Sequence, residues 1–280
     1  MTTRESVLSD RRTTGTAGDV VRQVAVISAL CFMLIASLVN SGVLGGPSVD
    51  ELQDGALSAE GSYLAPAGPA FSIWSVIYVG LAAYTIWQAL PSQRANPRQR
   101  ALGWLIAGSM VLNGLWLVVA RFGSLVGTVL AIVGLLIVLA IWFQRAVATP
   151  TDGWLDALLI DGVSGLHFGW VTVATVANTA AWLTEIGPPE WELASDVWGI
   201  IMLVLVGIIA LGIAGAGGWR IAPALAIAWG LSWIAVGRLA GEPESAPIGI
   251  AAVIVAAVVV IVTLAGAAFM RAADVRNAGA

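Results

Sequence analysis

The stretch that decides the fold is HFGWVTVATVANTAAW, residues 167–182, an almost wholly apolar run that includes one histidine and one asparagine. Spacings of three, four and seven place His167, Trp170, Ala174 and Asn178 near one face of a helix. Ala174 is small and lies one turn from Trp170 and one turn from Asn178, so the pattern predicts a hollow for a flat, mostly apolar ligand. The alternative is packing of Trp170 on a neighbouring helix and a hydrogen bond from Asn178 across the interface.

The composition around this stretch is that of a protein embedded in lipid. Of 280 residues, 59% are hydrophobic and only 11% are charged, whereas soluble domains carry about 25% charged residues. We therefore expect the lipid bilayer to be a partner and nucleic acid not to be one, because no basic stripe exists outside short loops. Cys31 is the only cysteine, which excludes an intrachain disulfide and a metal site built on cysteine.

Eight apolar runs have about the 20 residues that a helix needs to cross the hydrocarbon core. The sequence thus predicts an all-α integral membrane protein with eight transmembrane helices, between a disordered polar tail at 1–19 and a second tail at 271–280. The runs cover approximately residues 20–40, 66–90, 101–120, 124–143, 154–182, 197–216, 219–236 and 247–270.

The arginines predict the orientation of these helices. With the N-terminus inside, the inner segments hold eleven arginines and the outer segments hold only Arg121 and Arg238. Positive residues are enriched in cytoplasmic loops. We therefore expect a multi-pass protein of the cell inner (plasma) membrane with both termini in the cytoplasm.

Two ionisable residues in the fifth run are candidates for proton coupling. A carboxylate such as Asp161 is expensive within a membrane span and suggests a function. His167, the only histidine, can be an axial haem ligand, a proton-relay group or a buried imidazole bonded to a backbone carbonyl. Six residues separate the two side chains and turn them to different faces, so a simple pair is not expected.

The sequence contains no nucleophilic triad, phosphate-binding loop or metal-spaced cluster of histidine and cysteine. We therefore expect no catalytic residue, no metal site and no obligatory cofactor, and we regard an enzymatic activity as the less favoured possibility.

Three stretches carry a family resemblance. The first is Pro66-Ala67-Gly68 followed by Phe71, Trp74 and Tyr78; the second is Asn113-Gly114-Leu115-Trp116; and the third is WVTVATVAN at 170–178. In order and position they resemble the TspO/MBR family, the tryptophan-rich sensory proteins related to the translocator protein or peripheral benzodiazepine receptor. The match departs from the family pattern in the spacing of Phe71 and Trp74, in Pro69 and in Val173.

The resemblance covers residues 20–183 and implies a five-helix TspO-like bundle whose pocket opens toward the loop after the first helix. Residues 184–270 would then add three transmembrane helices. The resemblance also implies a homodimer and porphyrin, haem or sterol-like ligands. Carried over residue by residue, the ligand-binding candidates are Trp74, Tyr78, Asn113, Trp116, Trp170, Ala174 and Asn178. His167 is a further ligand-binding candidate because its imidazole can bind haem.

These observations favour a membrane TspO-like protein that binds a planar hydrophobic ligand for sensing or translocation. One alternative is a proton-coupled secondary transporter of a small hydrophobic solute, in which Asp161 and His167 couple protons. Another is breakdown of a porphyrin at the tryptophan-lined pocket.

Overall fold

The computed structural model describes residues 15–188 and 194–278, and within these ranges the chain folds into helices joined by turns and loops, without a strand. Eight helical stretches there are long and apolar enough to cross a membrane. The all-α membrane fold with eight spans is thereby confirmed. The elements are α1 (Ala17–Asn40), the 3₁₀ turn η3 (Gly68–Ser72) leading into α2 (Ile73–Ala89), α3 (Pro97–Phe122), α4 (Leu125–Ala148), α5 (Trp154–Asp156) continued by the π-helix η5 (Ala157–Gly162) and by α6 (Val163–Ile186), α7 (Ser195–Ala216), α8 (Ile221–Ala240) and α9 (Ala246–Ala278).

Helices extend into both predicted tails where the structure describes them. Residues 1–14 of the first tail lie outside the described residues, and α1 already begins at Ala17. The Thr16 side chain accepts from the Asp19 backbone amide and the Asp19 carboxylate accepts from the Thr16 amide, which forms a capping box. At the other end, α9 continues past Met270 to Ala278.

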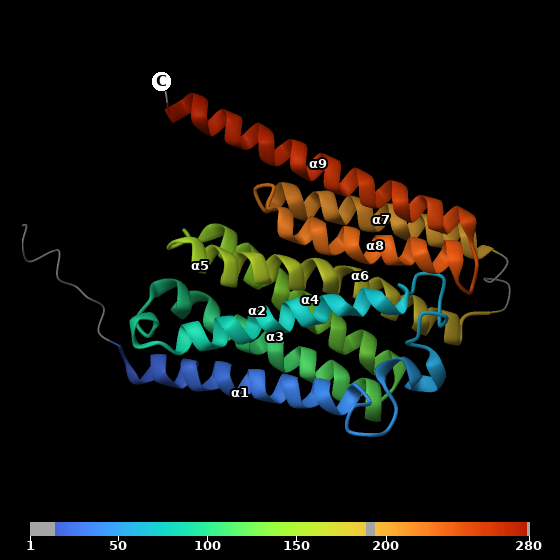
Figure 1. Ribbon diagram of the computed structural model, residues 1–280, viewed down its shortest axis with the longest axis horizontal. Coiled ribbons are helices and arrows are strands. Elements are labelled where there is room, and N and C mark those ends of the chain that lie inside the picture. The colour runs from blue at the N-terminus through green and yellow to red at the C-terminus, as the bar shows by residue number, and fades with distance from the viewer. Residues whose placement is uncertain (1–14, 189–193, 279–280) are drawn as a thin grey trace, which may run out of the picture.

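Figure 1 shows α1 and α3 on one side of the molecule, α2, α4 and α6 in the middle, and α7, α8 and α9 on the other side. The start of α1 and the end of α9 lie at the same end of the bundle, here called the terminal end. The segment 41–67 lies at the opposite end, here called the loop end.

The buried apolar side chains form two clusters that share α6. The first joins α1 to α6 through residues such as Met33, Ile77 and Ile106. The second joins α6 to α7, α8 and α9, and includes Val173 and Ile227. Helix α6 is therefore packed on both of its sides, which explains how an almost wholly apolar helix is accommodated.

Glycines allow α6 and α8 to approach closely. A Cβ atom added to Gly169 would lie 2.3 Å from the Pro223 carbonyl oxygen, and one added to Gly165 would lie 2.9 Å from the Pro223 Cδ. Gly230 of α8 meets Val173 of α6 in the same way. Small residues at such crossings bring helix backbones together in membranes, so this contact joins the last three helices to the preceding ones.

Helix α8 also fixes the segment that leads into α2. The Trp229 Nε1 atom donates to the Ala70 carbonyl oxygen at 2.8 Å, and the Ala67 amide donates to the Trp233 carbonyl oxygen at 3.1 Å. The chain just before α2 is thereby held against a helix that lies more than 150 residues later.

Candidate functional site

Five aromatic side chains from η3, α2 and α6 gather at one place, here called the aromatic cluster: Phe71, Trp74, Tyr78, His167 and Trp170. The ring centroid of Trp74 lies 5.4 Å from that of Tyr78, 5.7 Å from that of His167 and 6.1 Å from that of Trp170. Phe71 meets Trp170 edge-on at 5.8 Å. The edge-to-face arrangement is the one that aromatic pairs favour, and it arises because residues 167 and 170 share one helical face, as the spacing predicts.

The cluster contains buried polar atoms that do not pair. His167 is fully buried and Trp170 is 1% exposed. Within the described part of the chain, neither imidazole nitrogen of His167 nor the Trp170 Nε1 atom has a hydrogen-bond partner. Buried polar groups are nearly always paired, so these three nitrogens are donors and acceptors that a bound molecule can use. The expected bond from His167 to a backbone carbonyl is not found among these residues.

Trp116 and Asn178 pair with each other. The Trp116 Nε1 atom donates to Asn178 Oδ1 at 3.1 Å, and Asn178 Nδ2 donates to the Ala174 carbonyl oxygen at 2.9 Å. Asn178 thus forms the hydrogen bond across a helix interface that was the alternative to a ligand contact. Ala174 is half-buried and packs against the first apolar cluster.

Asn113 lies beside Tyr78. Its side chain is 1% exposed, and it faces the Tyr78 hydroxyl together with Ser37 of α1. Across the described residues no acceptor meets its Nδ2 atom. The predicted ligand-binding residues therefore lie in one region between α1, α2, α3 and α6, partly as the aromatic cluster and partly as the Trp116–Asn178 pair.

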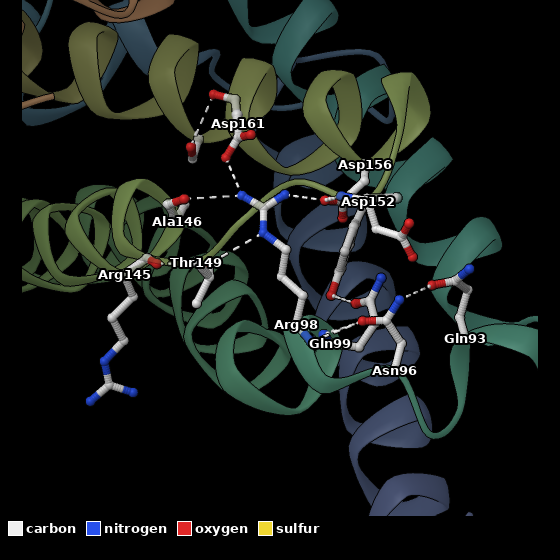
Figure 2. Close-up of polar contacts among 12 residues, drawn as sticks. Gln93, Asn96, Arg98, Gln99, Arg145, Ala146, Thr149, Asp152, Asp156 and Asp161 are labelled. Atoms are coloured by element: carbon white, nitrogen blue, oxygen red, sulfur yellow. Dashed lines mark hydrogen bonds and ion pairs between the residues drawn. The ribbon is translucent and has the colours of Figure 1, made fainter. Parts of the chain in front are cut away.

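A second polar site lies at the terminal end and surrounds Arg98 of α3 (Figure 2). The buried Arg98 guanidinium forms an ion pair with the Asp156 carboxylate and donates to Asp161 Oδ1 at 2.5 Å. It also donates to the Ala146 carbonyl oxygen at 3.1 Å and to Thr149 Oγ1 at 3.2 Å. The side chain therefore ties α3 to the end of α4 and to the start of the fifth span.

The π-helix η5 explains how one arginine reaches two carboxylates. Asp156 and Asp161 are five residues apart, a spacing that would turn them about 140° from each other on an α-helix. A π-helix closes its hydrogen bonds between residues five apart, so both carboxylates come to the side where Arg98 lies. Arg220, in the turn before α8, adds a second contact to Asp161 at 2.7 Å. Single π turns occur frequently at functional sites.

Sequence reasoning singled out Asp161 but missed its two partners, Arg98 and Arg220, and the role of Asp156 as the second carboxylate that Arg98 contacts. A buried carboxylate requires a cation, and residues 94–100 supply three arginines. The sequence therefore indicates that an arginine pairs with Asp161, but it does not identify which one. Asp161 lies in the arginine network and His167 in the aromatic cluster, in agreement with the prediction that the two do not form a simple pair.

The family model described as TSPO-like protein matches residues 22–265. The chain belongs to the TSPO-like protein family. The matched range runs from α1 into α9, so in this TSPO-like chain it includes the three helices that the sequence motifs did not reach. The chain matches no curated protein and no solved structure.

In this TSPO-like chain a cavity of about 250 Å³ lies between α2, α6 and α8. It is bounded by Ile73 of α2, Leu166 of α6 and Trp229 of α8, among others. Ile73 and Leu166 precede Trp74 and His167 in the chain, but none of the five residues of the aromatic cluster lines this cavity.

Proposed function

We propose that this membrane protein binds a planar hydrophobic ligand, a porphyrin, haem or sterol-like molecule, at the aromatic cluster for sensing or translocation. The proposal rests on one observation: buried aromatic rings lie in the same cluster as buried nitrogens that have no hydrogen-bond partner among the described residues. Membership of the TSPO-like family supports a TspO-like membrane role.

The chemistry of the cluster suits such a ligand. Indole and phenol rings stack on a planar aromatic molecule, and His167 and Trp170 offer polar atoms toward its rim or centre. For haem, a nitrogen of His167 is the axial ligand that the cluster can supply. Because the rings of Trp74, His167 and Trp170 pack against one another, a ligand must separate them to bind.

A fluorescence titration tests the proposal. Detergent-purified protein is titrated with protoporphyrin IX while tryptophan emission is followed, in wild type, in Trp170→Phe and in Trp104→Phe. Trp104 is on α3 but is 53% exposed, so it serves as the matched control. We expect saturable quenching that is roughly two- to tenfold weaker in affinity for Trp170→Phe, from the loss of an aromatic contact, and unchanged in Trp104→Phe. Equal, unsaturable quenching in all three proteins means partitioning into detergent and rejects the proposal.

We further propose that the protein lies in the cell inner (plasma) membrane with both termini in the cytoplasm, as a homodimer. The distribution of eleven arginines against two supports the orientation, and the start of α1 and the end of α9 lie at one end of the bundle (Figure 1). The homodimer rests on the family resemblance.

The arginine network favours a second candidate function, proton-coupled transport of a small hydrophobic solute. Asp161 lies within a membrane span and forms ion pairs with Arg98 of α3 and with Arg220 before α8, so any change in these ion pairs would be linked to movement of α3 and α8. We expect uptake of protoporphyrin IX into liposomes to follow an imposed proton gradient in wild type and in Asp152→Asn, whose carboxylate is exposed. Loss of this uptake in Asp161→Asn supports coupling, whereas wild-type uptake in that variant rejects it.

A further inference from the structure

A cavity of about 360 Å³ lies between α6, α7 and the residues just before α2. Its α6 wall consists of Val176, Thr179, Ala180 and neighbours, which point to the opposite side of the helix from His167 and Trp170. The volume is in the range of about 300–1,000 Å³ that small-molecule sites occupy. The cavity is thus separate from the aromatic cluster.

The lining changes character along the helices. On α6 it extends from Val176 to Gly187, eleven residues or roughly 16 Å at 1.5 Å per residue. The end near the loops carries the hydroxyls of Thr184 and Ser195, whereas Val176 and Met202 line the end toward the middle of the bundle. Thr179 also lines the cavity near Val176, but its hydroxyl donates to the Thr175 carbonyl oxygen at 2.8 Å. The described lining residues include hydroxyl-bearing side chains but none that is charged.

Ser62 supplies the polar group of the cavity. This lining residue is 3% exposed, and its hydroxyl has no hydrogen-bond partner among the described residues. Its position is fixed by the buried Arg238 of α8, which donates to the Ser62 carbonyl oxygen at 3.3 Å and to the Ala59 carbonyl oxygen at 2.9 Å. A positioned, unpartnered hydroxyl at one end of an apolar cavity is a hydrogen-bonding site for one polar atom.

We propose that this cavity binds a neutral single-chain amphiphile of the fatty-alcohol type. Its hydroxyl pairs with Ser62 at the loop end, and its chain extends along the seam between α6 and α7 toward Met202. The long, narrow shape suits one chain, and the change from hydroxyl-bearing to apolar lining matches a molecule with one polar end. A fatty acid is disfavoured, because its carboxylate would lose water without meeting a cation in the lining.

Quenching of Trp198 gives a direct readout, because this tryptophan also lines the cavity. Detergent-purified full-length protein is titrated with a bromine-labelled fatty alcohol. We expect saturable quenching that is largely lost in Trp198→Phe and weakened about two- to tenfold in affinity in Ser62→Ala, the usual effect of one hydrogen bond. Ala180→Phe fills the cavity and is expected to abolish binding. Ala257→Phe, at an exposed position of α9, makes the same change away from the cavity and is expected to bind normally.

Three results would overturn the proposal: unchanged quenching in Ala180→Phe, unchanged affinity in Ser62→Ala, or equal affinity for a bromine-labelled fatty acid. The melting temperature measured on the same preparations shows whether Ala180→Phe is folded. The Trp170→Phe variant is expected to bind the fatty alcohol like wild type, so failure of the porphyrin proposal and failure of this one are distinguishable.

Discussion

Arg98 forms ion pairs with two carboxylates at the terminal end of the bundle, and Arg220 adds the second positive charge. Removing one partner from a buried ion pair costs about 3–5 kcal/mol, because the remaining charge is left without compensation. We expect Arg98→Met to lower the free energy of unfolding by about that amount, and Asp161→Asn to lower it by less, because Arg98 keeps Asp156. Denaturant unfolding in detergent measures both. Arg145→Met is the control, since the exposed Arg145 points away from the network in Figure 2, and equal stability of Arg98→Met and this control would contradict the prediction.

The hydrogen bond between Trp116 and Asn178 provides a second prediction for single residues. Polar contacts between membrane helices contribute on average about 0.6 kcal/mol and at most about 1.7 kcal/mol in double-mutant cycles. A cycle of Trp116→Phe and Asn178→Ala is expected to give a coupling energy in this range. The same cycle with Trp104→Phe in place of Trp116→Phe is expected to be additive, as for distant residues. Additivity in both cycles would show that the bond does not stabilise the fold.

For these residues the sequence predicts which side chains share a helix face better than it predicts which side chains they contact. The period of the helix places His167 and Trp170 together, and the structure brings both against Trp74. The contact between Trp116 and Asn178 joins residues 62 positions apart, and no local pattern specifies such a distance. Asn178 can bind a ligand or pair with a helix, and only the packing of α3 on α6 decides between them.

At the scale of one element, the π-helix η5 determines whether Asp156 and Asp161 face the same arginine. A π turn holds one residue more than the α-helical turn it replaces, so deletion of one residue restores the α-helix. We expect insertion of one alanine after Leu158, which is 55% exposed, to turn Asp156 by about 100° away from Arg98 and to destabilise the protein about as much as Arg98→Met. Deletion of Leu158 leaves Asp156 and Asp161 four residues apart, only about 40° from each other on an α-helix, so this variant is expected to keep both carboxylates on the side of Arg98 and to be more stable than the insertion variant. An insertion variant as stable as Leu158→Ala, which keeps the π turn, would show that the alignment of the two carboxylates does not stabilise the protein.

The helices and the π turn differ in how far the sequence determines them. The eight spans follow from length and hydropathy, since each apolar run has only one way to satisfy its backbone in lipid. The π turn follows from contacts that residues 156 and 161 make with α3, and ALLIDG, residues 157–162, contains no residue type that specifies it. Accordingly, the position of the fifth span is predicted correctly from the sequence, whereas the π turn that aligns the carboxylates of the arginine network is not predicted.

On the scale of the whole molecule, α6 is the wall that two sites share. Its one face carries His167 and Trp170 of the aromatic cluster, and its opposite face lines the cavity shared with α7. Helix α8 touches both regions, through Trp229, which donates to the Ala70 carbonyl oxygen next to Phe71, and through Arg238 at Ser62. The last three helices therefore position residues of the preceding bundle, and both proposed sites require α6 and α8 to be packed together.

The glycine contact between α6 and α8 makes this requirement testable. A side chain at Gly169 would place its Cβ atom 2.3 Å from the Pro223 carbonyl oxygen, so the helices must separate to accept it. We expect Gly169→Val to lower the melting temperature and to let the two parts of the chain separate after cleavage at a protease site engineered between α6 and α7. The control is Gly212→Val on α7, because a Cβ atom there meets nothing within 4 Å in the described structure.

Separation in size-exclusion chromatography distinguishes the two variants. In wild type and Gly212→Val the cleaved parts are expected to co-elute, because the second apolar cluster still joins α6 to α8. In Gly169→Val the parts are expected to elute apart, and binding of both protoporphyrin IX and the fatty alcohol is expected to fall, since α8 no longer holds the residues around Ala70 and Ser62. Co-elution with wild-type binding in Gly169→Val would mean that the close approach at Gly169 is not what holds α8 against α6.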